Sequence, residues 1–324
     1  MKKRIHLLIL IGLLFIIAGL VVFAVYRVNR WINPVTLNIE LSRDDYDNYV
    51  DNYDILTPLT DNDGYLVRQD VKTILILGNN PFYDDANDTD GLAALLEMES
   101  GANIINCSIP GTCMSSGTAS PDFEENPSGL YSPYYLTSLL LYKGDLYTTF
   151  LENELAFGDI IPSNASDVVK ILYETDPSDI DVIIYMYDLN DYEQDNIIYD
   201  PEDEFKLYTV CGNLNSAFKM IELSGLQIRP IVMSPYYTGY VDENGQAVSR
   251  EFYSNTFGRP SDYVLCMADT VAASCNASFV DNYFGSITED NYSKYLSSDN
   301  VLNNSGKELL ISRLMYILTY FYEK

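Results

Sequence analysis

The single histidine of this chain limits the chemistry open to it. His6 lies within the first ten residues, beside a long apolar run, and no other histidine follows. Serine and cysteine hydrolases that work near neutral pH need a base hydrogen-bonded to the nucleophile, and that base is usually a histidine. The rest of the chain therefore has no residue for Ser-His-Asp or Cys-His catalysis, and none for a histidine-ligated zinc site.

Polar residues follow apolar segments that have the length and composition of buried strands, at 73–77, 103–107, 181–186, 227–233 and 278–280. Segments of helical pattern alternate with them, at 91–98, 134–155 with a break at Gly144, 165–173, 204–223, 262–275 and 307–322. This alternation predicts a three-layer α/β/α fold of flavodoxin-like type with a parallel sheet. Ligands of such sheets bind beyond the carboxyl ends of the strands. The site is therefore expected in the loops 79–85, 108–113, 187–192 and 234–237.

These loops resemble the conserved blocks of the SGNH/GDSL hydrolases, and the resemblance covers residues 71–324. The family's first block is an apolar strand followed by Gly-Asp-Ser, and residues 78–80 here read Gly-Asn-Asn, with Asn80 at the nucleophile position. Gly111 matches the glycine of the family's oxyanion hole. The third block, Gly-x-Asn-Asp, matches residues 188–191, which keep Asn190 but not the glycine.

The block before the last helix departs furthest from the family. Its Asp-x-x-His pattern aligns with Ser298 at the aspartate position and Val301 at the histidine position. A shift by one residue recovers Asp299 but places Leu302 at the histidine position. The resemblance therefore implies a hydrolase fold without the catalytic Ser and His, and loss of triad members costs roughly 10⁴-fold or more in rate.

The remaining polar groups are candidates for binding. Asn80, Asn190 and the backbone amide of Gly111 are expected to form a polar cradle for a carbonyl or a sugar hydroxyl. The leading hypothesis is thus an inactive SGNH-like domain at the cell envelope, with a glycan or acylated ligand or a scaffolding role. The loops would serve a scaffold equally well if they only satisfied one another, and an adhesin-like module would need no pocket.

An active esterase or deacylase with a non-standard site is the alternative. Ser234 and Ser108 are then the candidate nucleophiles, and Asp191 or Asp299 the candidate base.

No cofactor or metal site is predicted. Asp88, Asp90 and Glu97 have the spacing of calcium ligands around Gly91, but Ala86 occupies the first ligand position, where a calcium loop has aspartate.

The cysteine count is odd and sparse, with Cys107, Cys113, Cys211, Cys266 and Cys275. This does not indicate a disulfide framework, and buried free thiols are expected. Cys107 and Cys113 could pair across a loop.

The amino-terminal end has the features of a membrane anchor. Residues 7–25 carry no charge, and nineteen residues nearly span the ~30 Å hydrocarbon core. The positive charge before this run favours a cytoplasmic N-terminus, so we predict a single-pass membrane protein with an extracytoplasmic domain. A cleaved signal peptide is the alternative. The predicted parts are a cytoplasmic tip and anchor (1–27), a juxtamembrane segment (28–70) and the SGNH-like domain (71–324).

Charge narrows the set of partners. Beyond residue 30 the chain has 14 cations and 47 acids, a net charge of −33. Such a body repels nucleic acid, so none is expected as a partner. The expected partners are the membrane, through the N-terminal helix, and cell-wall or extracellular polysaccharide or its acyl groups.

Overall fold

The computed structural model describes residues 53–59, 71–117 apart from 85 and 87, and 126–320 apart from 243 and 275. The predicted transmembrane helix at 7–25 lies outside these residues. Within the described residues, no helix combines the length and hydropathy needed to cross a membrane.

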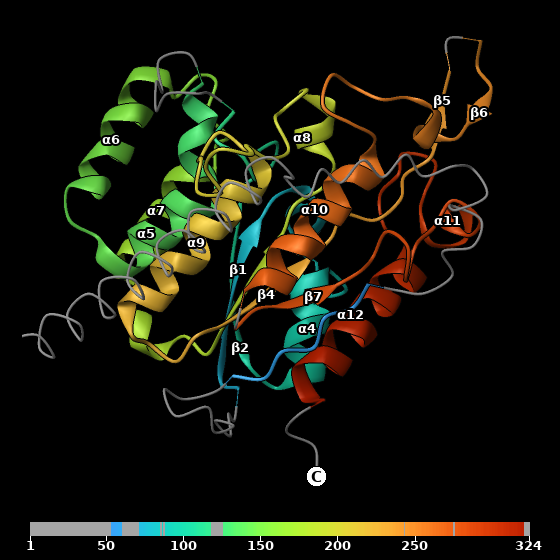
Figure 1. Cartoon of the computed structure of the whole chain (residues 1–324). Coiled ribbons are helices and arrows are strands. Elements are labelled where there is room, and N and C mark those ends of the chain that lie inside the picture. The colour runs from blue at the N-terminus through green and yellow to red at the C-terminus, as the bar shows by residue number, and fades with distance from the viewer. Residues whose placement is uncertain are drawn as a thin grey trace, which may run out of the picture. The chain divides into compact units, whose positions relative to one another are not determined.

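A parallel five-stranded sheet forms the centre of the domain (Figure 1). Its strand order is β2 (Asn103–Ser108), β1 (Thr73–Gly78), β3 (Val182–Met186), β4 (Arg229–Met233) and β7 (Ser278–Val280). Gly78 at the end of β1 is level with Ser108 of β2 and Met186 of β3. The carboxyl ends of these three strands therefore meet at one edge, as the sequence predicts.

The helices are α3 (Asn80–Tyr83), α4 (Leu92–Ser100), α5 (Pro133–Tyr142), α6 (Asp145–Phe157), α7 (Ala165–Glu174), α8 (Asn190–Glu193), α9 (Val210–Ser224), α10 (Pro260–Ala273), α11 (Tyr292–Tyr295) and α12 (Asn304–Thr319). Between β4 and α10 the chain also forms a hairpin of β5 (Tyr240–Val241) and β6 (Ala247–Val248), and the 3₁₀ turn η3 (Arg250–Phe252).

Two buried clusters cover the two faces of the sheet. Leu75 and Leu77 of β1 belong to the cluster formed with α5, α7, α9 and α10. Ile74 and Ile76 belong to the other cluster, with α4 and α12. Alternate residues of one strand thus enter opposite cores, as the period of two in a strand requires. The three-layer α/β/α fold with a parallel sheet is confirmed.

Helix α9 begins later than the expected residue 204. Thr209 provides the N-cap, because its hydroxyl accepts a hydrogen bond from the backbone amide of Gly212. Before it, Asp200 and Asp203 accept backbone hydrogen bonds from residues two positions further on, which closes local turns instead of helix.

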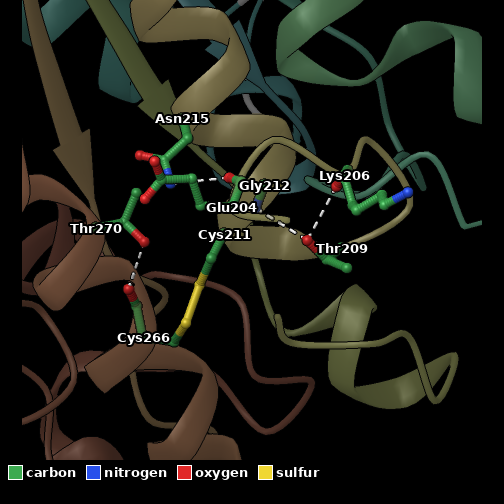
Figure 2. Close-up of a disulfide and its surroundings, with 8 residues drawn as sticks. All are labelled: Glu204, Lys206, Thr209, Cys211, Gly212, Asn215, Cys266 and Thr270. Atoms are coloured by element: carbon green, nitrogen blue, oxygen red, sulfur yellow. Dashed lines mark hydrogen bonds between the residues drawn. A yellow bond between two sulfur atoms is a disulfide. The ribbon is translucent and has the colours of Figure 1, made fainter. Parts of the chain in front are cut away.

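A disulfide joins Cys211 of α9 to Cys266 of α10 (Figure 2). Their Cα atoms lie 6.4 Å apart, although 55 residues separate them in sequence. The expectation of free thiols is therefore wrong for this pair. The two helices lie against the same sheet face, and that contact could not be deduced from cysteine spacing. Cys107 and Cys113 are free and buried, and they do not pair with each other.

Residues 53–59, part of the predicted juxtamembrane segment, pack against the edge of the sheet. Ile55 forms a two-hydrogen-bond antiparallel bridge with Phe279 of β7, at 3.0 and 2.9 Å. Arg313 of α12 donates to both carboxylate oxygens of Asp54. This segment therefore completes the β7 edge of the domain.

A fully buried arginine connects the sheet to the last helix. Arg229, at the start of β4, donates from Nη2 to the Ser278 hydroxyl and to the Ile317 carbonyl, both at 3.0 Å. Its Nη1 lies 3.4 Å from the Leu318 carbonyl. These carbonyls lie at the carboxyl end of α12, where the helix dipole favours a positive charge.

Replacement of this cation should destabilise the domain strongly. Arg229→Ala leaves buried carbonyls without a donor and opens a cavity, so we expect a loss of about 2–4 kcal/mol in the free energy of unfolding. Urea denaturation followed by circular dichroism measures it. The exposed Lys219→Ala is the control, since its surface ion pair with Glu222 should contribute less than ~1 kcal/mol. Equal effects of the two substitutions would contradict the role given to Arg229.

Candidate functional site

One buried carboxamide fastens together the loops that follow β1, β2 and β3. Asn79, fully buried after β1, donates from Nδ2 to the Thr112 carbonyl at 2.8 Å and to Asp188 Oδ1 at 2.7 Å. Its Oδ1 accepts from the Asp188 backbone amide at 2.8 Å. Both donors and the acceptor of this amide are therefore used, and the three strand ends are held in one geometry.

The residue at the nucleophile position, Asn80, is held from both sides. It opens α3, and its Oδ1 accepts from the backbone amide of Gly111 at 3.0 Å. Its Nδ2 donates to Asp188 Oδ2 at 2.8 Å. Gly111 has a φ of +72°, which favours glycine. The Gly111 amide, which the sequence resemblance predicts to be an oxyanion donor, is here bonded to the side-chain oxygen of Asn80.

Asn190 belongs to the same network. It opens α8, its backbone amide donates to Asp188 Oδ1 at 2.9 Å, and its Nδ2 lies 3.3 Å from the Thr112 carbonyl. The structure thus brings together the three residues predicted to bind a ligand, Asn80, Gly111 and Asn190.

A pocket of about 210 Å³ opens beside this network. Its lining residues are Asn80, Pro81, Asp84, Asp188, Leu189, Asn190, Glu193, Tyr236, Thr238, Arg250, Asp299, Asn300 and Val301. The set contains no serine, cysteine or histidine. The volume is below the ~300–1,000 Å³ of pockets for drug-sized ligands, so it suits a group the size of one sugar ring.

The loop before α12 forms the opposite wall. Val301, at the position of the family's histidine, lines the pocket together with Asp299. Ser298 is exposed, does not line the pocket, and its hydroxyl lies 3.4 Å from Asp299 Oδ1. Asn300 has a φ of +61° and exchanges two hydrogen bonds of 2.9 Å with the backbone of Gly239. That pair closes the wall against the segment after β4.

Asp188 is the central residue that sequence reasoning missed. Burial raises the pKa of its carboxyl, while hydrogen bonds from Asn190, Asn79 and Asn80 act in the opposite direction. The available signal was its position, because it replaces the family's glycine. Asp188 follows β3, which lies beside β1 in the sheet, and the asparagines at 79 and 80 follow β1. An acid at this position therefore indicates a carboxylate with two amide donors.

Three of the four candidate groups of the esterase alternative lie outside the pocket lining. Ser234 is fully buried, donates to the Pro235 carbonyl and accepts from the Asn282 amide. Ser108 is also buried and outside the pocket lining. Asp191 is buried as well and accepts from the amides of Met114 and Ser115, at 2.7 and 3.1 Å. Of the four candidates for that mechanism, Asp299 alone reaches the pocket.

Charge at the pocket mouth is predominantly negative. Arg250 forms an ion pair with Glu193, and both line the pocket. Asp84, Asp188 and Asp299 add three further carboxyl groups. Across the described part of the chain, no three acidic, cysteine or histidine side chains are arranged to hold a metal ion.

No protein-family model matches the chain, and no curated protein matches it in sequence. Among solved structures, it is similar to a protein from Lactobacillus plantarum, with a TM-score of 0.51 and 16% identity over 78% of this chain and 99% of that one. For a possible lipase from Chitinophaga pinensis the TM-score is 0.46 and the identity 11%, over 77% of this chain and 98% of that one. For a putative GDSL-like lipase from Bacteroides ovatus the TM-score is 0.42 and the identity 11%, over 78% of this chain and 100% of that one.

The likeness is one of fold. At these identities it carries no information about activity. The match to the Lactobacillus plantarum protein shows a shared fold, and kinship with the SGNH/GDSL hydrolases stays a prediction from the sequence.

The hydrogen bonds of Asn79 predict that its replacement by aspartate destabilises the domain strongly. Asn79→Asp replaces an amide donor by an oxygen that faces Asp188 Oδ1 and the Thr112 carbonyl. We therefore expect the free energy of unfolding to fall by about 3 kcal/mol or more at pH 7. Chemical denaturation measures it, with the exposed Asn304→Asp as control, expected within ~0.5 kcal/mol of wild type. Comparable stability of Asn79→Asp and wild type would rule out the donor role of Asn79.

Buried carboxyl groups predict a pH dependence of stability. Burial raises the pKa of Asp188, Asp191, Glu251 and Asp281. The folded chain then binds protons more readily than the unfolded chain, so stability rises as the pH falls from 7.5 towards 5. The pKa values of Asp176, Asp200 and Asp242 are lowered by local hydrogen bonds, and these groups oppose the trend only below about pH 4.

Thermal unfolding of the full-length chain at pH 7.5, 6.25 and 5 is the measurement. The melting temperature should increase at each step, and relief of repulsion in the acidic body acts in the same direction. A melting temperature that falls over this range would show that the buried carboxyl groups are not protonated more easily in the folded state.

Proposed function

We propose that this chain is a membrane-anchored, extracytoplasmic protein whose SGNH-hydrolase-like domain binds a neutral glycan without hydrolysing it. The observation that supports this most is the carboxamide of Asn80, held between the Gly111 amide and the Asp188 carboxylate. A neutral amide is no useful nucleophile, but it donates and accepts hydrogen bonds.

The pocket lacks a nucleophile and a histidine base at the positions that the resemblance assigns to them. Val301 cannot act as a base, and no hydroxyl or thiol stands at the position of Asn80. The Gly111 amide is already bonded to Asn80, so it is not free to stabilise an oxyanion without a rearrangement. These features support an inactive domain.

The polar groups of the pocket suit sugar hydroxyls. Its carboxylates accept hydrogen bonds, its asparagines both donate and accept, and Tyr236 adds an aromatic surface. The excess of carboxyl groups disfavours an anionic ligand, because the one guanidinium, Arg250, is already paired. A neutral sugar ring fits these constraints better than an anionic or lipid ligand.

Two features support export of the domain. Residues 7–25 form an apolar run that follows basic residues. The Cys211–Cys266 disulfide is typical of oxidising compartments outside the cytoplasm.

The absence of hydrolysis is tested with the full-length chain purified in detergent. We expect turnover of p-nitrophenyl acetate to equal that of a heat-denatured sample, since the pocket holds no activated nucleophile. Ser108→Ala and Ser234→Ala provide the comparison. Turnover well above the denatured sample that one of these substitutions abolishes would establish an active esterase and refute the inactive domain.

Binding is tested by calorimetry with two-unit oligomers of β-1,4-linked N-acetylglucosamine and of β-1,4-linked glucose. Asp299→Asn, in the pocket wall, should weaken binding at least about fivefold, because it removes a charged acceptor from the pocket. Asp290→Asn, exposed and outside the pocket lining, should leave the affinity unchanged. No binding of either sugar by the wild-type chain would overturn the proposal.

A further inference from the structure

Exposed aromatic and aliphatic side chains gather on the hairpin segment next to the pocket. Tyr240 and Val241 of β5 are 36% and 60% exposed, and Phe252 and Tyr253 in and after η3 are 70% and 42% exposed. We call Tyr240, Phe252 and Tyr253 the aromatic platform, because Val241, the next residue of β5, points to the opposite face of the strand. Figure 1 shows β5 and β6 projecting from the body of the domain at the end where α8 lies.

Two rings of the platform contact each other. The ring centroids of Tyr240 and Tyr253 are 5.1 Å apart, and the rings meet edge to face at 63°. The guanidinium of Arg250 lies 5.7 Å from the Tyr240 centroid. Tyrosine presents a flat apolar face and a hydroxyl, which is the combination that a sugar ring, apolar on its C–H face and polar at its rim, can use.

The platform stands on a fixed base. The Tyr192 hydroxyl donates to the Tyr253 carbonyl at 2.9 Å. Glu251, between the exposed residues of η3, is buried, and its carboxylate accepts from the hydroxyls of Ser261 and Tyr283. A surface whose backbone is already ordered loses little conformational entropy when a ligand binds.

Arg250 connects the platform to the pocket. The same side chain lines the pocket, pairs with Glu193 and lies over Tyr240. Thr238, another lining residue, is two positions before Tyr240. The pocket and the platform are therefore neighbouring parts of one surface, and a chain that leaves the pocket past Arg250 meets Tyr240.

The charge around the platform restricts its occupant. Glu193 and Asp299 line the adjoining pocket, Asp242 follows β5 in sequence, and Arg250 is neutralised by its ion pair. An anionic lipid surface or polyanion would be repelled. A second copy would carry the same negative charge, and three side chains are few for an interface that needs ~20–30 residues a side.

We propose that the aromatic platform is a binding subsite for the sugar units that extend a neutral glycan beyond the pocket. This inference rests on the proposed function, because the pocket must hold the first unit. The domain then recognises a polysaccharide chain along its length.

Oligomers of two lengths separate the pocket from the platform. The full-length chain is titrated by calorimetry with two-unit and six-unit oligomers of the two sugar series used above. Tyr240→Ala/Tyr253→Ala should weaken binding of the six-unit oligomer about tenfold and leave the two-unit affinity unchanged. Tyr199→Ala/Tyr316→Ala removes two exposed tyrosines that do not belong to the platform and should change neither affinity.

The remaining outcomes contradict one proposal or both. If wild type binds both lengths equally and the platform variant binds like wild type, the platform is not a subsite, and the proposed function stands. If wild type binds neither length, the proposed function fails and the platform proposal fails with it. If sedimentation shows a dimer that the platform variant loses, the surface is a contact between copies and the inference is overturned.

Discussion

The hydrogen bonds between Asp188 and the carboxamides of Asn79 and Asn80 set the geometry of the loops that follow β1, β2 and β3. One carboxylate oxygen takes the amide of Asn79, the other takes the amide of Asn80, and the first also accepts from the Asn190 backbone. A buried carboxylate is costly unless such donors compensate it. The two asparagines and the aspartate are therefore a matched set, and a change to any one of them removes a hydrogen-bond partner from another.

This matching gives a physical account of the departures from the hydrolase blocks. An aspartate at position 79, as in the family pattern, would face the carboxylate of Asp188 at hydrogen-bond distance. A serine at position 80 is shorter than asparagine, and its hydroxyl would donate and accept from one atom, whereas Asn80 contacts Asp188 and the Gly111 amide with two separate atoms. Asn80 and Asp188 thus belong to a closed hydrogen-bond network with a pocket beside it.

The sequence was sufficient for the sheet and for part of the site. Each strand of the five-stranded sheet was predicted from its apolar residues within two positions at either end, because buried parallel strands need continuous apolar runs, whereas the short exposed strands β5 and β6 were not predicted. Asn80, Gly111 and Asn190 could be placed together because parallel strand ends meet at one edge. The anchor and the domain boundary at residue 27 lie outside the described residues and stay predictions.

Other features depend on contacts between distant segments and could not be read in this way. Asp188 lies 109 residues from Asn79 in sequence, and the pairing of Arg250 with Glu193 joins residues 57 apart. The 55-residue separation of Cys211 and Cys266 gave no hint of their bond. Each of these contacts depends on the path of a loop or the packing of two helices, which hydrophobic periodicity does not specify.

The three residues of η3 reverse the usual distribution of polar and apolar side chains. Glu251 is 9% exposed, whereas its neighbour Phe252 is 70% exposed. Folding alone favours the opposite arrangement, because burial of phenylalanine is favourable and burial of a carboxyl group is costly without hydrogen bonds. Here the carboxylate of Glu251 holds the turn by accepting from Ser261 and Tyr283, and the phenylalanine is left at the surface beside Tyr253. The conformation of η3 therefore depends on the buried hydrogen bonds of Glu251 and not on burial of its aromatic residue.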